Sequence, residues 1–215
     1  QVLIHDDAST DQTTNILRAY EEKYPTLIRV YYQKKNTYRS PRKRQLRSEF
    51  YSWSQGKYVA LCEGDDYWTD PLKLKKQVKF LEENDNYNLI YHDAEVIYEQ
   101  NPSQNHLFHQ FPWCITDPRR LDYGANDIVS SAIYPTCSLM YRKYSATLSD
   151  EFAGSYPFGD RCIGLLSCGK GAIRFSPEVM ACYRRHENGA TRNFHGDKFN
   201  ISMLRFYLSS MLMNM

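Results

Sequence analysis

The chain has 215 residues, of which 42% are hydrophobic, and its formal net charge at pH 7 is +2. This length and apolar content are enough to bury a core, which excludes a disordered chain and predicts one large domain with at most a small appendage. A net charge near zero argues against a protein that binds nucleic acid or a membrane surface over its whole face.

The six cysteines form no C-x-x-C pair and none of the spacings of a zinc site. Several lie inside apolar segments, which predicts reduced, mostly buried thiols and therefore a cytoplasmic protein. No apolar segment approaches the roughly 20 residues that a spanning helix needs, and the sequence shows no signal peptide. We therefore expect a soluble protein, for which peripheral association with the inner face of a membrane is the one membrane contact compatible with the sequence.

The chain begins on the strand-like residues 1–4 without an initiator Met, so we expect a first strand and helix to lie upstream. The acidic residues Asp6 and Asp7 follow this strand. A capping box that starts at Ser9 then predicts a helix, which Pro25 ends, and a second strand-like segment follows. The order is therefore strand, helix, strand, with carboxylates at the carboxyl end of the first strand.

Seven basic residues lie between Lys34 and Arg47, and two interpretations of them remain open. Runs of like charge are commonly a solvated face. Alternatively, one or two of these cations contact a diphosphate, which a guanidinium such as that of Arg47 binds through two parallel hydrogen bonds. The segment leads into a predicted helix that ends at Gly56.

The most informative segment is the strand-like run at residues 57–62, which leads straight into Glu63, Asp65 and Asp66. In open α/β sheets, ligands bind beyond the carboxyl ends of the strands. Clustered carboxylates repel one another unless a cation lies between them, and Mg²⁺ or Mn²⁺ takes oxygen ligands that it often shares with substrate phosphates. The segment therefore predicts a nucleotide–metal site. The alternative is a polar turn in which Asp65 or Asp66 only caps the next helix.

The rest of the chain continues the alternation of strands and helices. Further strands are predicted at residues 89–92, 138–141, 172–175 and 179–183, and further helices after Pro71, at 161–168 and at 197–215. The helix after Pro71 is expected to bury Leu74, Val78 and Leu81 and to turn its lysines to water. Residues 98–126 lack periodicity, which predicts a long irregular segment of the kind that often carries function. This pattern predicts the α/β class with much of the sheet parallel.

Two later residues allow both a structural and a functional interpretation. Asp160 stands at the start of a predicted helix, where a carboxylate is commonly an N-cap. His186 follows two arginines, and a lone histidine is more often structural than a metal ligand.

Five motifs occur in an order that resembles family 2 of the inverting glycosyltransferases, which have the GT-A fold. The motifs are Asp6-Asp7-Ala-Ser-Thr-Asp11, Arg47 ahead of Gly56-Lys57-Tyr58, Glu63-Gly-Asp65-Asp66-Tyr-Trp, Gly159-Asp160 and Tyr183-Arg184-Arg185-His186. The resemblance covers about residues 2–190. It implies a GT-A domain at residues 1–190, a mostly parallel, mixed sheet flanked by helices, and a C-terminal helical segment at residues 191–215.

The resemblance also implies how the donor is bound. Asp7, together with Asp6, matches the carboxylate that contacts the uracil of a nucleoside-diphosphate sugar, and Arg47 matches an arginine of the donor pocket. Within the central acidic segment one acid contacts the ribose, so Glu63 and Asp65 are expected to bind the donor. Because the two acidic segments follow parallel strands, we expect them at the same edge of the sheet.

The metal and the reaction are implied in the same way. Asp65 and Asp66 match the acids that hold Mn²⁺ or Mg²⁺ on the diphosphate, Asp160 matches the catalytic base, and His186 matches a late metal or phosphate contact. Glu63 departs from the family pattern, which has Asp there, and this leaves open which acids share the metal.

The function expected is transfer of a sugar, with inversion, from a UDP-linked donor to a hydroxyl of a glycan or lipid-linked acceptor in cell-surface polysaccharide biosynthesis. The alternative is a nucleic-acid-binding module built on residues 34–47, which combine basic and aromatic side chains. The near-zero net charge and the acidic segments argue against that module, so no nucleic-acid partner is expected. A two-metal phosphohydrolase would need a second set of ligands, which the sequence does not supply.

Overall fold

The structure is a computed structural model, and it describes residues 1–37, 50, 52–130, 134–143, 159–168, 171–187 and 189. The chain divides into two compact units, Gln1–Lys57 with Leu148–Gly154 and Tyr58–Thr147 with Ser155–Met215. Each unit has a sheet of its own. The predicted helix at residues 197–215 and the basic residues 38–47 lie outside the described residues.

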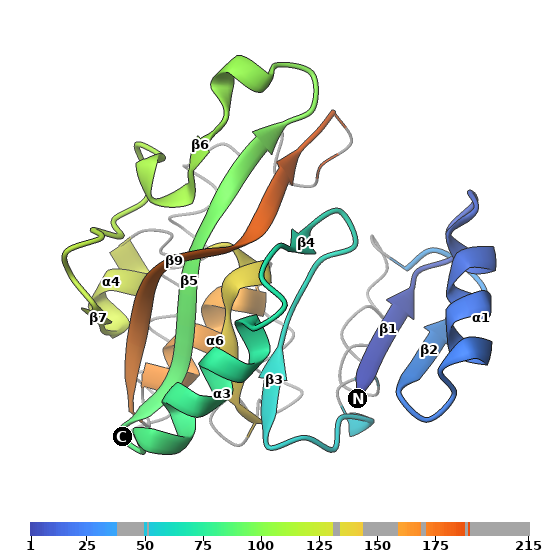
Figure 1. The fold of residues 1–215 in the computed structure, drawn as a ribbon, viewed down its shortest axis with the longest axis horizontal. Helices are drawn as coiled ribbons and strands as arrows, with labels where there is room; N and C mark the ends of the chain where they lie inside the picture. The colour runs from blue at the N-terminus through green and yellow to red at the C-terminus, as the bar shows by residue number, and fades with distance from the viewer. Residues whose placement is uncertain are drawn as a thin grey trace. The chain divides into compact units, whose positions relative to one another are not determined.

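The first unit has the strand, helix, strand order that the sequence predicts (Figure 1). Strand β1 (Val2–Asp6) pairs in parallel with β2 (Ile28–Tyr32), with α1 (Thr13–Lys23) between them in the chain. The predicted capping box is wrong. Helix α1 has Gln12 at its N-cap and no side-chain cap, because the Ser9 hydroxyl donates its hydrogen bond to the Asp6 carboxylate instead.

The second unit is built on a seven-stranded mixed sheet. Its main path runs β3 (Tyr58–Ala60), β8 (Met140–Arg142), β5 (Tyr87–Tyr98), β9 (Ala172–Arg185) and β4 (Tyr67–Trp68). The short strands β6 (His106–Leu107) and β7 (Asp122–Tyr123) pair with β5 and β9. Strands β5 and β9 run parallel side by side over most of their length (Figure 1), whereas the other pairings of this sheet are antiparallel. The predicted α/β class with a mixed sheet is confirmed.

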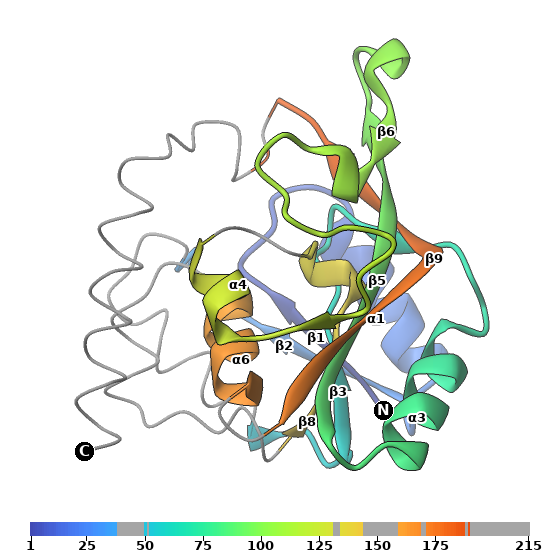
Figure 2. The same cartoon turned by 90° about the vertical axis from the view of Figure 1, so that its left-hand side faces the viewer.

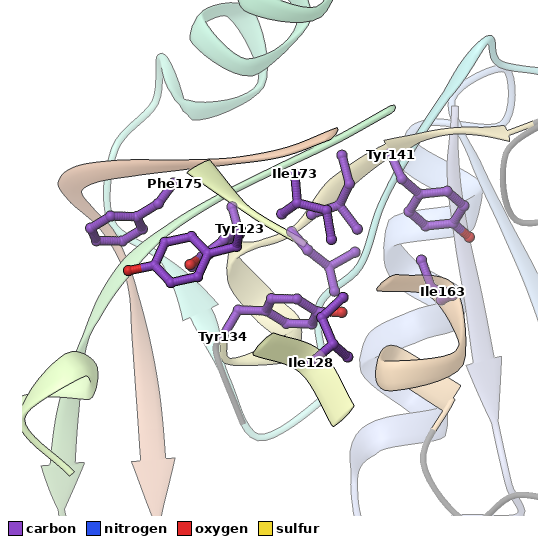
Figure 3. Close-up of a cluster of buried hydrophobic side chains, with 10 residues drawn as sticks. Tyr123, Ile128, Tyr134, Tyr141, Ile163, Ile173 and Phe175 are labelled. Carbon is purple, nitrogen blue, oxygen red and sulfur yellow. The ribbon is translucent and has the colours of Figure 1, made fainter. Parts of the chain in front are cut away.

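Helices cover both faces of this sheet. Helix α3 (Lys73–Glu83) lies on one side of it, and α4 (Ala125–Ser130) and α6 (Gly159–Cys168) lie on the other (Figure 2). Successive strand residues point to opposite faces, and β5 divides its side chains in this way. Leu89 packs with Ile128 and Ile163 in the larger core cluster (Figure 3), whereas Ile90 packs with Leu81 of α3.

The predicted buried face of α3 is confirmed for Leu81, and Val78 packs against the same cluster, but it is wrong for Leu74 and Lys73. Leu74 is 42% exposed, whereas Lys73 and Gln77 are buried with Leu81. The Lys73 ammonium donates to Gln77 Oε1 at 2.9 Å and lies over the Trp68 ring, and Gln77 Nε2 donates to the Ser138 carbonyl at 2.8 Å. Polar groups can be buried when they find such partners, and the hydrophobic pattern of the helix does not reveal partners that come from other elements.

Two strands are longer than the sequence predicts. Strand β5 continues past residue 92 to Tyr98, and β9 is one strand, Ala172–Arg185, across the two segments that were expected to be separate. The expected irregular region contains short elements, among them the 3₁₀ helices η1 (Pro102–Gln104) and η2 (Phe108–Gln110), and a third, η3 (Thr136–Ser138), precedes β8. Among the described residues, no helix is long and apolar enough to cross a membrane.

Candidate active site

The acidic turn at residues 63–66 joins β3 to β4 and lies beside the end of β9. The Asp66 N–H donates to the Glu63 carbonyl at 3.2 Å, which closes the turn. Immediately afterwards β4 pairs with β9, with Tyr67 opposite Cys182. This pairing brings the turn next to the residues that follow Cys182 along β9.

The arginine at position 184 holds the acidic turn in place. Its backbone N–H donates to Asp66 Oδ1 at 2.9 Å, and its guanidinium donates to the Asp65 carbonyl and, at 3.0 Å, to Glu99 Oε1. His186 Nε2 lies 3.2 Å from Asp65 Oδ2. The structure therefore brings together three predicted site residues, Asp65, Asp66 and His186, from segments about 120 positions apart in the chain.

The environment of Asp66 disfavours its charged form. Among the described residues no N–H or O–H group donates to its buried Oδ2 atom, and the Cys137 thiol next to this carboxyl is only a weak donor. Burial raises the pKa of Asp66 to about 6, against the lowering effect of the Arg184 N–H, and the neighbouring Asp65 charge raises it further. A carboxylate that is short of donors in this way is prepared to accept a cation or a donor from a ligand.

Glu63 shares this environment. Removal of water by the surrounding protein raises the pKa of Glu63 to about 7, and the charges of Asp66, Asp160 and Asp65 raise it as well, whereas a hydrogen bond with Thr136 lowers it. Glu63 nevertheless keeps a solvent-exposed surface, so solvent screens part of this effect. The three acids of the turn therefore concentrate negative charge, which the Arg184 guanidinium, shared with Glu99, offsets only in part.

These acids open into a pocket of about 330 Å³. Glu63, Asp65 and Asp66 line it together with residues 183–187 at the end of β9, and residues that follow β5 form the remaining wall. The pocket thus combines carboxylates, cationic side chains and neutral polar groups, as small-molecule sites do.

Asp160 lies in the first turn of α6 and is electrostatically close to the acidic turn, since its charge contributes to the raised pKa of Glu63. Its Oδ1 atom accepts the Arg161 N–H at 2.9 Å, which is a helix-start contact. The Tyr134 hydroxyl donates to the Asp160 carbonyl at 2.9 Å. Tyr134 can approach α6 because position 164 is glycine, where a Cβ atom would stand 2.1 Å from that hydroxyl.

The first acidic segment belongs to the other unit and is held differently. Asp6 is buried, and its two oxygens accept hydrogen bonds from the N–H and hydroxyl of Ser9 and, at 3.2 Å, from the Thr14 hydroxyl. Asp7 uses Oδ1 to accept the N–H and hydroxyl of Thr37 at 2.8 and 2.7 Å. Asp6 is thus committed to its own loop, whereas Asp7 retains one oxygen without a hydrogen bond to the described residues. The expected proximity of this segment to Asp65 and Asp66 stays a prediction.

Two residues change the site that the sequence predicted. Arg47, the expected donor-pocket arginine, lies outside the described residues. Arg184 lies in the motif Tyr183-Arg184-Arg185-His186, and the sequence alone gives it no role, although it organises the acidic turn. Its position two residues before His186 is the one signal that the sequence offers.

The carboxylate oxygens that line the pocket are suitable ligands for a divalent cation. Among the described residues, no three His, Cys, Asp or Glu side chains are arranged to hold a metal ion by themselves. Mg²⁺, however, is commonly held by one or two carboxylates and completes its shell with water and substrate phosphates. The buried Oδ2 of Asp66 and the adjacent Asp65 carboxylate supply oxygen ligands of this kind.

Comparison with known proteins identifies the family. The family model described as glycosyl transferase family 2 matches residues 1–148. The chain belongs to this family. Its mixed α/β fold agrees with the GT-A fold of family 2, and the acidic segments and Arg47 lie inside the match. Asp160 and His186 lie beyond residue 148, so their proposed roles depend on the contacts described above.

The chain is also similar to individual proteins, one of which has a name that agrees with this family. Uncharacterized proteins of Mycobacterium tuberculosis (Rv1520) and Mycobacterium bovis (Mb1547) are each 34% identical over 198 residues, which is 92% of this chain and 54% of theirs. A Bacillus subtilis protein named as a teichuronic acid biosynthesis glycosyltransferase, TuaG, is 37% identical over 83 residues, 39% of this chain and 31% of TuaG. The chain therefore spans about half the length of the mycobacterial relatives.

Proposed function

We propose that this glycosyltransferase moves a sugar from a nucleoside-diphosphate donor, UDP-linked, to a hydroxyl of a glycan or lipid-linked acceptor in polysaccharide biosynthesis, with inversion. The observation that carries the proposal is the acidic turn of residues 63–66, in which a buried oxygen of Asp66 receives no N–H or O–H from the described residues, at a pocket that Arg184 and His186 also line. The family supplies the reaction class, and the name of TuaG supports a polysaccharide acceptor.

Each end of the donor has its own candidate residues. Within the described part of the chain nothing donates to the second carboxylate oxygen of Asp7, which could accept the N–H of a uracil ring. Asp65 and Asp66 would hold Mn²⁺ or Mg²⁺ with the diphosphate, and Arg47 would add charge-assisted hydrogen bonds to the phosphate oxygens. A bound cation of this kind supplies charge stabilisation to the leaving diphosphate.

Asp160 would act as the base. The acceptor hydroxyl gives its proton to the Asp160 carboxylate as its oxygen forms a bond to the anomeric carbon, and the bond from that carbon to the diphosphate oxygen breaks with its electron pair. Attack from the face opposite the leaving group inverts the anomeric centre. Such a base typically contributes about 10²- to 10⁴-fold in rate, and the fixed start of α6 would keep it in position.

The test is isothermal titration of UDP into the full chain across a range of Mn²⁺ concentrations. Asp66→Ala should abolish the Mn²⁺-dependent part of UDP binding, because it removes a ligand of the ion. Arg47→Ala should weaken binding while leaving its metal dependence intact, because a guanidinium contacts only the phosphate.

The matched control is Glu83→Ala, which removes an exposed carboxylate at the end of α3 and should change nothing. Equal metal dependence in Asp66→Ala and Arg47→Ala would contradict the roles proposed. Binding of single-stranded RNA in preference to UDP with Mn²⁺ would favour a nucleic-acid module instead.

A further inference from the structure

The pocket has a second wall that no step of the proposed reaction uses. Tyr98, Gln100, Asn101 and Gln104 line the pocket opposite the acids. They come from the end of β5 and from the turn that η1 forms beyond it. Figure 1 shows this segment continuing past the end of β5, and Figure 2 shows the chain returning beside β5 as β6. All four side chains are uncharged, whereas the facing wall consists largely of charged groups.

The turn that carries this wall is well ordered by its own hydrogen bonds. The Asn101 N–H donates to the Tyr98 carbonyl at 3.2 Å, and the Gln104 N–H donates to the Asn101 carbonyl at 3.0 Å. The Asn105 side chain accepts the Tyr98 N–H at 2.9 Å. Because the backbone of the turn is fixed locally, binding of a ligand has to order only the side chains of the wall.

The amides of the wall are available to a ligand. Gln100 and Gln104 are exposed, and neither side chain forms a hydrogen bond within the part of the chain that the structure describes. Each amide offers two N–H donors and a carbonyl acceptor. Such groups match the hydroxyls of a sugar, which both donate and accept, while the apolar face of Tyr98 can pack against the C–H face of a sugar ring.

The charges around the pocket select against an anionic ligand at this wall. Four acids, the three of the turn and Glu187, line the same pocket, against two arginines, Arg184 and Arg185, so the acids outnumber the arginines. The Arg184 guanidinium, which could have attracted an anion, is already bonded to Glu99 and to the Asp65 carbonyl. The volume of about 330 Å³ lies at the small end of the range for small-molecule sites, roughly 300–1,000 Å³.

We propose that the neutral wall formed by Tyr98, Gln100, Asn101 and Gln104 is a binding subsite for a neutral saccharide, the acceptor end of the reaction. Gln100 and Gln104 are its specificity-determining residues. This inference rests on the proposed glycosyl transfer, because the acids on the opposite wall then bind the donor. The subsite determines which hydroxyl of the acceptor sugar can reach the donor, and the acidic turn binds the donor.

The experiment measures saccharide binding and UDP binding separately on the full chain. Saturation-transfer NMR is recorded with methyl β-glucoside, methyl β-galactoside and methyl β-N-acetylglucosaminide in the presence of UDP and Mn²⁺, and with methyl β-glucuronide as an anionic probe. UDP binding is titrated in parallel. The double variant Gln100→Ala/Gln104→Ala removes the two free amides. Asn86→Ala is the matched control, because it removes an exposed amide just before the opposite end of β5.

We expect at least one neutral glycoside to bind the wild type and to bind the double variant about tenfold more weakly, as the loss of two hydrogen bonds implies. Asn86→Ala should bind it like the wild type, and UDP affinity and melting temperature should be equal in all three proteins. Unchanged glycoside binding in the double variant, preference for the glucuronide, or absence of glycoside binding while UDP binds would each overturn the subsite. Loss of UDP binding with retained, glutamine-dependent glycoside binding would instead overturn the proposed donor and leave the subsite standing.

Discussion

The two acidic segments of this chain follow a strand in the same way, yet their carboxylates have opposite surroundings. Asp6 accepts hydrogen bonds on both oxygens from Ser9 and Thr14. Asp66 accepts one backbone N–H on Oδ1, and its buried Oδ2 receives no N–H or O–H from the described residues. Buried polar atoms usually have partners, so the exception marks the segment in which a ligand would complete the site.

The difference teaches that an acid at a strand end is not by itself a binding residue. A carboxylate that its own loop satisfies, like that of Asp6, contributes to folding. A carboxylate that has few hydrogen-bond donors and a raised pKa, like that of Asp66, destabilises the ligand-free protein when it is charged, and a bound cation would stabilise it. Four substitutions can break or sharpen this contrast.

The largest effect is expected for Asp160→Asn, which adds a third acid to the comparison. An amide oxygen still accepts the Arg161 N–H, so the helix start and UDP affinity should be retained. Asn takes no proton, so turnover should fall by at least about 10²-fold. Melting temperature, UDP affinity and sugar transfer are to be measured on one preparation. Transfer within a few-fold of wild type would assign Asp160 to a capping role only.

The next effect is on stability in the first segment. Asp6→Ala should lower the free energy of unfolding by about 2 kcal/mol, because it leaves the donors of Ser9 and Thr14 without their acceptor. Urea denaturation at pH 7 measures this, with Glu22→Ala on the exposed face of α1 as a control expected within about 0.5 kcal/mol of wild type. Equal stability of Asp6→Ala and the control would show that the internal hydrogen bonds do not hold this loop.

Asp66→Asn should raise the free energy of unfolding, whereas Asp6→Ala lowers it. The pKa of Asp66 in the folded chain, about 6, lies above the unfolded value of about 3.9. The folded state therefore binds more protons between these pH values, and the wild type loses stability as pH rises through them. Asn has no proton to lose. The stability of the variant relative to the wild type should therefore increase between about pH 4 and 6, by about 1 kcal/mol after allowance for solvent screening.

Denaturation of both proteins from pH 4 to 7.5 measures that gain. Addition of UDP and Mn²⁺ should reverse it, since a ligand that binds only the folded wild type stabilises that protein. A stability difference that does not vary with pH would mean that the buried oxygen of Asp66 carries no such penalty.

The smallest effect concerns the turn after Asp7. Ala8 has a φ angle of 60°, a left-handed conformation that costs an L-residue about 1–2 kcal/mol. Ala8→Gly should remove that strain and, after the entropy that glycine loses on folding, stabilise the chain by about 0.5 kcal/mol. Ala19→Gly within α1 is the matched control and should destabilise by about 1 kcal/mol. Thermal denaturation that gave both variants the same sign would argue against strain at this turn.

Much of the fold could be predicted because its signals are local. The strand and helix of the first unit, β3 and the start of α6 follow from apolar periodicity and helix-start residues, which act over a few positions. The prediction failed where distant groups decide the outcome. Lys73 is buried because its ammonium donates a hydrogen bond to Gln77 and lies over the Trp68 ring. The hydrophobic periodicity of α3 does not contain that information.

The sequence by itself determined the family, the order of the elements and the presence of acids after strands, because these depend on neighbouring residues and on motif order. Only the tertiary structure decided which acids matter. The pairing of β4 with β9 brings Arg184 and His186 to the acidic turn across about 120 residues, and Asp66 Oδ2 is left without an N–H or O–H donor among the described residues. Whether a buried carboxylate is satisfied depends on what the fold places against it, and that is a property of packing in space rather than of position along the chain.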